Sequence, residues 1–356
     1  MKKILLISLI LLALKTSASV HTVNNVPNGG AQFTTIQAAI DAAAQGDTIF
    51  IQGSPIAYPV FTLASKKIAF FGPGWSPDKN LPVRAEINGV TVQNDASSGS
   101  EFNGLVLKGG LDIPNSVNDL KFIRCEFKGG ASINGSANNW LIEGCYISGG
   151  VARFAFNAGL NYTNILFHNN VFRTNGFASI YGLANATGVL IDHNLFYLES
   201  PAVTNLGVFD NNCRFLTITN NVFVNVNAST QLSLSTFNNN ILFYPSIAAQ
   251  SAPWTVNNNI NGGGNVNGIN PQLSAQTAVN AGTDNPLLDF TIATGPANSS
   301  GSDGKDMGLL FDETGSLNWN ASRMSRLPVV TSMNITNPTI APAGTLNVEV
   351  TAKKSN

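Results

Sequence analysis

The sequence predicts an all-β protein: a single-stranded right-handed parallel β-helix, or solenoid, with an N-terminal amphipathic capping helix. Three observations predict this fold class. An eight-residue pattern recurs, its spacings of 19 to 27 residues are typical of a solenoid, and apolar residues alternate within it as in strands with one buried face. The copies are LKFIRCEF (120–127), WLIEGCYI (140–147), ILFHNNVF (165–172), VLIDHNLF (189–196), LTITNNVF (216–223), STFNNNIL (235–242) and WTVNNNIN (254–261).

The first, third and eighth residues of each copy are nearly all large and apolar, so we expect them to stack inward from coil to coil at about 4.8 Å. The sixth residue marks a bend, where Asn tolerates a left-handed conformation and bonds nearby backbone. We therefore predict an internal asparagine ladder from Asn170 to Asn259.

The three cysteines do not form a disulfide framework. Cys125 and Cys145 occupy equivalent positions in successive repeats, which favours buried free thiols. The sixth residues are Cys125, Cys145, Asn170, Asn194, Asn221, Asn240 and Asn259.

The ends of the chain have separate roles. Residues 1–18 have a basic start, a short apolar run and small residues at their end, which predicts a secretory signal peptide. Residues 33–52, FTTIQAAIDAAAQGDTIFIQ, predict an amphipathic helix that covers the open end of the solenoid, followed by the first strand. We predict the β-helix over 33–312, with its regular array reaching about Phe290, and a C-terminal β extension or tail over 313–356.

Composition limits the partners. Without the three lysines of residues 1–18, 16 basic residues stand against 20 acidic ones, a net charge of −4. A nucleic-acid partner would favour a basic surface, so we expect none. After the signal peptide, no stretch is long and apolar enough for a membrane helix. We expect a secreted monomer, located outside the cell, in a periplasm or at the cell surface.

The segments FTTIQAAIDAAAQGDTIFIQG (33–53) and GPANSSGSDGKDMGLL (295–310) resemble the first-strand signature and the closing motif of the pectate-lyase-like superfamily of right-handed parallel β-helices. The resemblance implies the fold and leaves the activity open, because the superfamily spans lyases, hydrolases, esterases, adhesins and proteins without known activity.

A closer likeness separates this chain from true pectate lyases. VLIDHNLF and LGVFDNNCRFLTITNNVF (206–223) are similar to two of their coils, where a "D-G-x-x-D" segment binds calcium. Only Asp210 matches, since the other aspartate position is Leu206, and residues 235–256 contain no Arg where the family carries its catalytic base. The pectate lyase active site is therefore missing. We predict no cofactor and no metal site; calcium has no supporting motif.

Outward-facing positions also stack. The fourth residues place Glu143, His168 and Asp192 on three consecutive coils, and the ninth residues add Arg173. A histidine between two carboxylates serves acid–base chemistry or metal ligation, and the alternative is a solvated ladder of opposite charges. These four residues are the catalytic candidates. His193 is expected at the turn, diverging from its neighbour Asp192.

The candidate carbohydrate-binding residues are Lys128, Arg153, Tyr181, Tyr197 and Asp210. Arg153, Tyr181 and Asp210 fall between the repeats, on another sheet, where loop insertions predict a groove. The alternative is an exposed arginine and tyrosine with no ligand. Asp303 and Asp306 are expected in a turn that closes the last coil.

Three functions follow from these features. The leading hypothesis is a secreted β-helix protein that recognises a polysaccharide or cell-surface glycan through an exposed groove, with catalysis unproven. The alternatives are a polysaccharide lyase or glycoside hydrolase, and a structural surface protein or adhesin with no small ligand.

Overall fold

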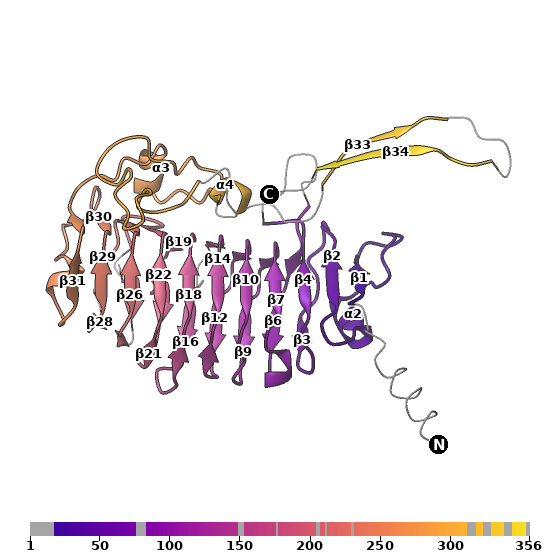
Figure 1. Ribbon diagram of the computed structural model, residues 1–356, viewed down its shortest axis with the longest axis horizontal. Helices are drawn as coiled ribbons and strands as arrows, with labels where there is room; N and C mark the ends of the chain where they lie inside the picture. The colour runs from indigo at the N-terminus through magenta and orange to yellow at the C-terminus, as the bar shows by residue number, and fades with distance from the viewer. Residues whose placement is uncertain are drawn as a thin grey trace, which may run out of the picture.

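The computed structural model describes residues 18–75, 83–148, 153–175, 177–203, 207–210, 212–228, 231–311, 318–322, 329–337 and 344–353. Residues 1–17 of the predicted signal peptide lie outside these ranges. The described chain is a parallel β-solenoid whose coils each add a strand to stacked sheets (Figure 1). Within the described ranges, no helix is both long and apolar enough to cross a membrane.

Three large parallel sheets form the walls. Sheet A contains β1 (Val20–Val23), β2 (Thr48–Ile51), β4 (Ala69–Phe71), β7 (Glu101–Asn103), β10 (Lys121–Ile123), β14 (Leu141–Glu143), β18 (Leu166–His168), β22 (Leu190–Asp192), β26 (Thr217–Thr219), β29 (Thr236–Asn238) and β31 (Ile260–Gly263). Sheet B contains β5 (Glu86–Ile87), β8 (Val106–Leu107), β11 (Glu126–Phe127), β15 (Tyr146–Ile147), β19 (Val171–Thr174), β23 (Leu195–Leu198), β27 (Val222–Val224), β30 (Ile241–Phe243) and β32 (Val266–Asn267). Sheet C contains β3 (Phe61–Leu63), β6 (Val90–Val92), β9 (Leu111–Ile113), β12 (Ala131–Ile133), β16 (Phe154–Phe156), β20 (Ile180–Tyr181) and β24 (Phe209–Asp210).

Smaller elements complete the coils. Short strands lie between sheets C and A: β13 (Ala137–Asn138), β17 (Tyr162–Thr163), β21 (Ala186–Thr187), β25 (Cys213–Arg214) and β28 (Leu232–Ser233). The helices are α2 (Ile36–Ala42), η1 (Asp95–Ser97), η2 (Pro253–Thr255), α3 (Gln276–Asn280) and α4 (Trp319–Ser322). Strands β33 (Val329–Ile335) and β34 (Val348–Lys353) form an antiparallel hairpin that projects from the solenoid (Figure 1).

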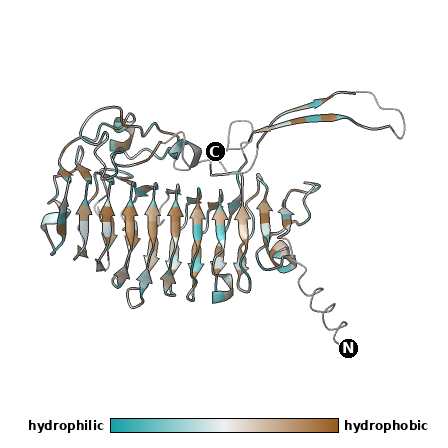
Figure 2. Cartoon of the chain, in the orientation of Figure 1, coloured by the Kyte–Doolittle hydropathy of each residue, from teal (hydrophilic) through white to brown (hydrophobic). Residues whose placement is uncertain are grey.

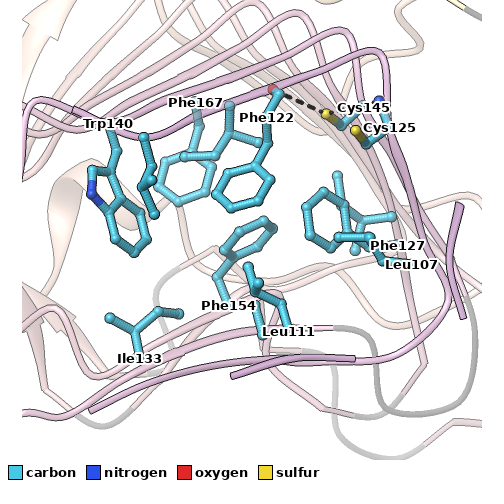
Figure 3. Packing of buried hydrophobic residues seen from close by; sticks show 14 of the residues in the cluster. Leu107, Leu111, Phe122, Cys125, Phe127, Ile133, Trp140, Cys145, Phe154 and Phe167 are labelled. Atoms are coloured by element: carbon cyan, nitrogen blue, oxygen red, sulfur yellow. Dashed lines mark hydrogen bonds between the residues drawn. The ribbon is translucent and has the colours of Figure 1, made fainter. Parts of the chain in front are cut away.

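The predicted inward columns are confirmed. The third residues Phe122 and Ile142 are register partners and fully buried. Eighth residues stack ring on ring, with centroids 4.7 Å apart for Phe172 and Phe196 and 4.9 Å apart for Phe196 and Phe223. Figure 3 shows aromatic rings filling the interior, and Figure 2 shows hydrophobic segments recurring on the strands from coil to coil. The core is therefore a continuous apolar axis.

The corner between sheets A and B, here called the A–B corner, bends at the fifth residue of each repeat. Asn169, His193, Asn220 and Asn239 have φ of 54°, 52°, 57° and 51°. The left-handed conformation was predicted at the sixth residue of each repeat, but it is found at the fifth residue, and the sixth side chain points inward.

Cys125, Cys145 and Cys213 are buried free thiols. Cys125 N donates to Cys145 Sγ at 3.4 Å, which places Cys125 and Cys145 in the column of sixth residues.

The buried asparagine ladder exists, but the prediction of Asn259 as its end is wrong. Each Nδ2 donates to the next Oδ1 at 3.0 Å, from Asn170 through Asn194, Asn221 and Asn240 to Asn265. The segment aligned as WTVNNNIN begins in η2, so the last coil is longer than its neighbours and β31 starts only at Ile260. Asn259 instead accepts from Ser235 N at 3.0 Å.

The N-terminal end differs partly from the prediction. Strand β1 pairs with β2, so the solenoid begins at Val20 and not at residue 33. Helix α2 starts after Thr35, whose hydroxyl accepts from Ala38 N at 3.2 Å as an N-cap. Its buried face, Ile36, Ala39 and Ile40, packs against β1, β2 and β3. That α2 blocks further strand addition stays a prediction.

The C-terminal part of the array is shorter than predicted. The last coil strand, β32, ends at Asn267 and not near Phe290. Residues 268–311, here called the fold-back segment, cover the outer face of sheet B. Apolar residues of that face form a second cluster with the segment; its members include Val171, Leu195, Val222, Ile241, Leu273, Val279, Phe290 and Leu309.

The end of the fold-back segment runs along the A–B corner against the order of the coils. Asn239 Nδ2 donates to Ser300 O at 2.9 Å, Ser302 N donates to Asn220 Oδ1 at 2.7 Å, and Leu310 N donates to Asn169 Oδ1 at 2.8 Å. The prediction that this stretch closes the last coil is therefore wrong, because it reaches back over the middle coils instead.

One turn residue is poorly suited to its backbone. Phe215 has φ 60° and is 52% exposed, so it adopts a left-handed conformation without burying its ring. Such a conformation costs most residues about 1–2 kcal/mol, whereas Asn tolerates it. Phe215→Asn should therefore raise the free energy of unfolding by about 0.5–1 kcal/mol, measured by urea titration. Leu287→Asn, equally exposed without a positive φ, is the control; a gain no larger than the control's contradicts the prediction.

Candidate functional site

The three predicted sheet A candidates do come together. Glu143, His168 and Asp192 are register partners on β14, β18 and β22. His168 Nδ1 lies 3.7 Å from Glu143 Oε2, and His168 Nε2 lies 3.5 Å from Asp192 Oδ2. All three side chains are largely buried, with 13% to 18% of their surface exposed. The arrangement is a mixed-charge ladder, and its acid–base or ligand role stays a hypothesis.

The expected divergence of Asp192 and His193 is wrong. His193 Nε2 lies 4.0 Å from Asp192 Oδ1 and 3.3 Å from Asp303 Oδ2, because the fold-back segment brings Asp303 to the A–B corner. His193 Nδ1 lies 3.0 Å from Gly308 O, and its buried Nε2 makes no aligned hydrogen bond. Among the described residues, no three or more His, Cys, Asp or Glu side chains are arranged to hold a metal ion.

A second charged cluster lies on sheet B, at the edge of the fold-back segment. It lines a cleft of about 440 Å³. Glu126 Oε2 accepts from Arg84 Nη1 at 3.0 Å, and Lys128 Nζ lies 3.9 Å from Glu126 Oε1. Burial raises the pKa of Glu126 to about 7, although the charges of Lys128 and Arg84 lower it. The lining residues are Arg84, Glu126, Lys128, Tyr146, Ser148, Asp284 and Pro286. We call this the sheet B cleft.

Sequence reasoning found only Lys128 of this cleft. Glu126 had a detectable signal in the sequence, because it and Glu86 are charged residues in an outward column that continues with Val106, Tyr146 and Val171. Asp284 had no such signal in the sequence, because only the path of the fold-back segment brings it to the sheet B cleft. Tyr146 OH donates to Asp284 Oδ1 at 2.6 Å.

Two other predicted residues lie under or beside the fold-back segment. Arg173 Nε donates to Gly282 O at 2.9 Å, and its Nη1 lies 3.4 Å from Glu199 Oε2, so Arg173 is on sheet B, apart from the three sheet A candidates. Tyr197 is fully buried, and its hydroxyl donates to Thr283 O at 3.0 Å. The prediction that Tyr197 contacts a glycan is wrong, because the fold-back segment covers it.

The remaining predicted residues meet on sheet C, as expected from their place between the repeats. Ala155, Tyr181 and Asp210 are register partners on β16, β20 and β24. The Arg153 guanidinium lies 4.8 Å from the ring centre of Tyr181 and 5.5 Å from that of Phe177. Phe177, which sequence reasoning missed, is 45% exposed. The Arg153 cation therefore makes cation–π contacts with two aromatic rings at one end of the sheet.

These residues continue a straight outward column. From β6 to β24, each coil contributes one residue in register, and coils lie roughly 4.8 Å apart. At the other end, a hollow of about 430 Å³ is lined by Thr91, Asp112 and Ser132 with flanking glycines. Gly109 is required there, since a Cβ would lie 1.5 Å from Asn88 O. The column, here called the sheet C track, is Thr91, Asp112, Ser132, Ala155, Tyr181 and Asp210.

The comparisons with known proteins are sparse. No family model matches the chain, and no curated protein does. Among solved structures, the chain is similar to the pectin methylesterase from Aspergillus niger in deglycosylated form, at 13% identity over 74% of this chain and 94% of that one, with a TM-score of 0.28. A likeness of this size carries no argument about the site. The parallel β-solenoid itself is the fold that the resemblance to the pectate-lyase-like superfamily implied.

Proposed function

We propose that the protein binds a neutral polysaccharide along the sheet C track. The observation that carries this proposal is the register of the track, which offers one outward side chain per coil along a straight line. An extended chain of repeating units can lie along such a line and meet a polar side chain at every position of the track except Ala155. Thr91, Asp112 and Ser132 supply hydroxyl and carboxylate groups that bind sugar hydroxyls.

The aromatic end of the track supplies the apolar contact. Tyr181 is partly exposed and Phe177 is 45% exposed, and flat rings of this kind cover the apolar face of a sugar. The Arg153 guanidinium lies over both rings, which limits their motion before a ligand arrives. The two ends together define a binding surface rather than a single pocket.

The charge of the track favours a neutral glycan over a polyanion. Asp112 and Asp210 are part of it, and the nearby cation, Arg153, already lies against two rings. A polyuronic acid would place carboxylates beside these aspartates, which is unfavourable. The partner is therefore a neutral polysaccharide or cell-surface glycan. Residues 1–18 support export, and we propose that the protein acts outside the cell or at its surface, as a monomer.

Affinity gel electrophoresis tests this proposal. Neutral polysaccharides embedded in the gel should retard the protein and polygalacturonate should not. Tyr181→Ala should weaken retardation about tenfold, which corresponds to the loss of roughly 1–1.5 kcal/mol of ring contact. Phe215→Ala removes an exposed ring outside the track and serves as the matched control. If no neutral polysaccharide retards the wild type, or both variants lose equally, the proposal fails and a structural role is favoured.

A further inference from the structure

We propose that the sheet B cleft is a catalytic site that hydrolyses a glycosidic bond, with Glu126 as the proton donor and Asp284 as the nucleophile. This activity goes beyond polysaccharide binding and does not depend on the sheet C track, since the two lie on different sheets. The cleft volume of about 440 Å³ suits a chain end or a short oligosaccharide.

The cleft places two carboxyl groups in contrasting surroundings. Glu126 lies on β11 with 6% of its side chain exposed, whereas Asp284 comes from the fold-back segment with 53% exposed. Both line the same cleft. Two carboxyl groups whose surroundings differ in this way divide the roles of acid and nucleophile in glycoside hydrolysis.

Neighbouring groups orient the Asp284 carboxyl group. Tyr146 OH donates to Asp284 Oδ1 at 2.6 Å, and Arg173 Nη1 lies 3.8 Å from Asp284 Oδ2. Tyr146 itself is buried against Trp75, with ring centres 5.9 Å apart, so the donating hydroxyl is rigid. A carboxylate oriented by one hydrogen bond and one ion pair has less freedom to lose when it attacks.

Glu126 is suited to give up a proton near neutral pH. The groups that face it are Arg84, Lys128 and Ser148, together with Glu86 and Asp284. Burial dominates over the two cations and raises the pKa of Glu126 to about 7. An acid is most effective when its pKa lies close to the working pH.

The reaction balances with water as the second substrate. Asp284 attacks the anomeric carbon, the bond from that carbon to the leaving oxygen breaks, and the leaving oxygen takes the proton of Glu126. Water then attacks the anomeric carbon of the glycosyl ester, returns a proton to Glu126 and releases the sugar and Asp284. Each cycle consumes one glycoside and one water.

A labelling experiment tests the site without knowledge of the sugar. The probe is 1,2-epoxy-3-(4-nitrophenoxy)propane, which esterifies a carboxylate when a nearby acid protonates its oxygen. Mass spectrometry of the full-length protein should find the ester on Asp284. Glu126→Gln should slow labelling on the order of a hundredfold. Wild-type labelling should fall roughly tenfold from pH 6 to pH 8, as Glu126 loses its proton.

The controls separate chemistry from folding and from glycan binding. Glu101→Gln removes a carboxylate on sheet A, outside every candidate site, and should label like the wild type. The pH profile of the wild type needs no variant to fold. Gel retardation by neutral polysaccharide should be unchanged in Glu126→Gln, because the sheet C track is separate. The proposal is overturned if Asp284 is labelled no faster than the exposed Asp112, or if Glu126→Gln labels at the wild-type rate.

Discussion

Replacing Asn221 with alanine should lower the free energy of unfolding by about 3–5 kcal/mol. The side chain is fully buried in the ladder. Its Nδ2 donates to Ile191 O at 2.9 Å, Thr219 O at 2.7 Å and Asn240 Oδ1 at 3.0 Å. Its Oδ1 accepts from Asn194 N at 2.8 Å and Asn194 Nδ2 at 3.0 Å. Alanine leaves these buried partners unpaired, at about 1–3 kcal/mol for each group that finds no substitute.

Urea unfolding followed by circular dichroism measures this loss. Asn134→Ala is the matched control, because Asn134 is exposed and its Nδ2 donates to Ser132 Oγ at 3.2 Å. We expect a change below about 0.5 kcal/mol for the control. A loss under about 1 kcal/mol in Asn221→Ala would mean that water replaces the ladder without cost.

Phe196→Ala should cost about 3–5 kcal/mol of unfolding free energy. The ring is fully buried and lies parallel to Phe172 and Phe223, at interplanar angles of 10° and 8°. Both neighbours belong to strands whose position the backbone ladder fixes, so they cannot move in to fill the space. The cavity therefore stays open, which is the condition under which large-to-small changes cost most.

Unfolding in guanidinium chloride measures the loss of stability in Phe196→Ala and in a control variant. Phe177→Ala removes the same side chain from a position that is 45% exposed, and it should cost less than about 1 kcal/mol. Equal losses in the two variants would show that stacking along the axis adds nothing to the stability of the fold.

The inward columns could be predicted because the repeat itself fixes the register. Once VLIDHNLF was aligned with its neighbours, Asn194 and Phe196 had to face inward, and Glu143, His168 and Asp192 had to be adjacent. The grouping of Arg153 with Tyr181 followed from their place outside the repeats. In each case the contact joins equivalent positions of successive coils, so periodicity carries the information.

Contacts that break the period could not be predicted. Because of the extra residues around η2, the last asparagine of the ladder is Asn265 and not Asn259. The fold-back segment buries Tyr197 and brings Asp284 to Glu126, and no repeat aligns that segment with sheet B. The raised pKa of Glu126 depends on burial from this packing, which neither composition nor spacing expresses.

The polar bonds between the fold-back segment and the A–B corner change how the molecule comes apart. In a plain solenoid each coil holds only its neighbours, so the ends can fray and unzip one coil at a time. Here Ser300, Ser302 and Leu310 tie the coils of Asn239, Asn220 and Asn169 together directly. We therefore expect the C-terminal coils to unfold together as one cooperative unit and not one at a time, because the fold-back segment links them to the middle coils.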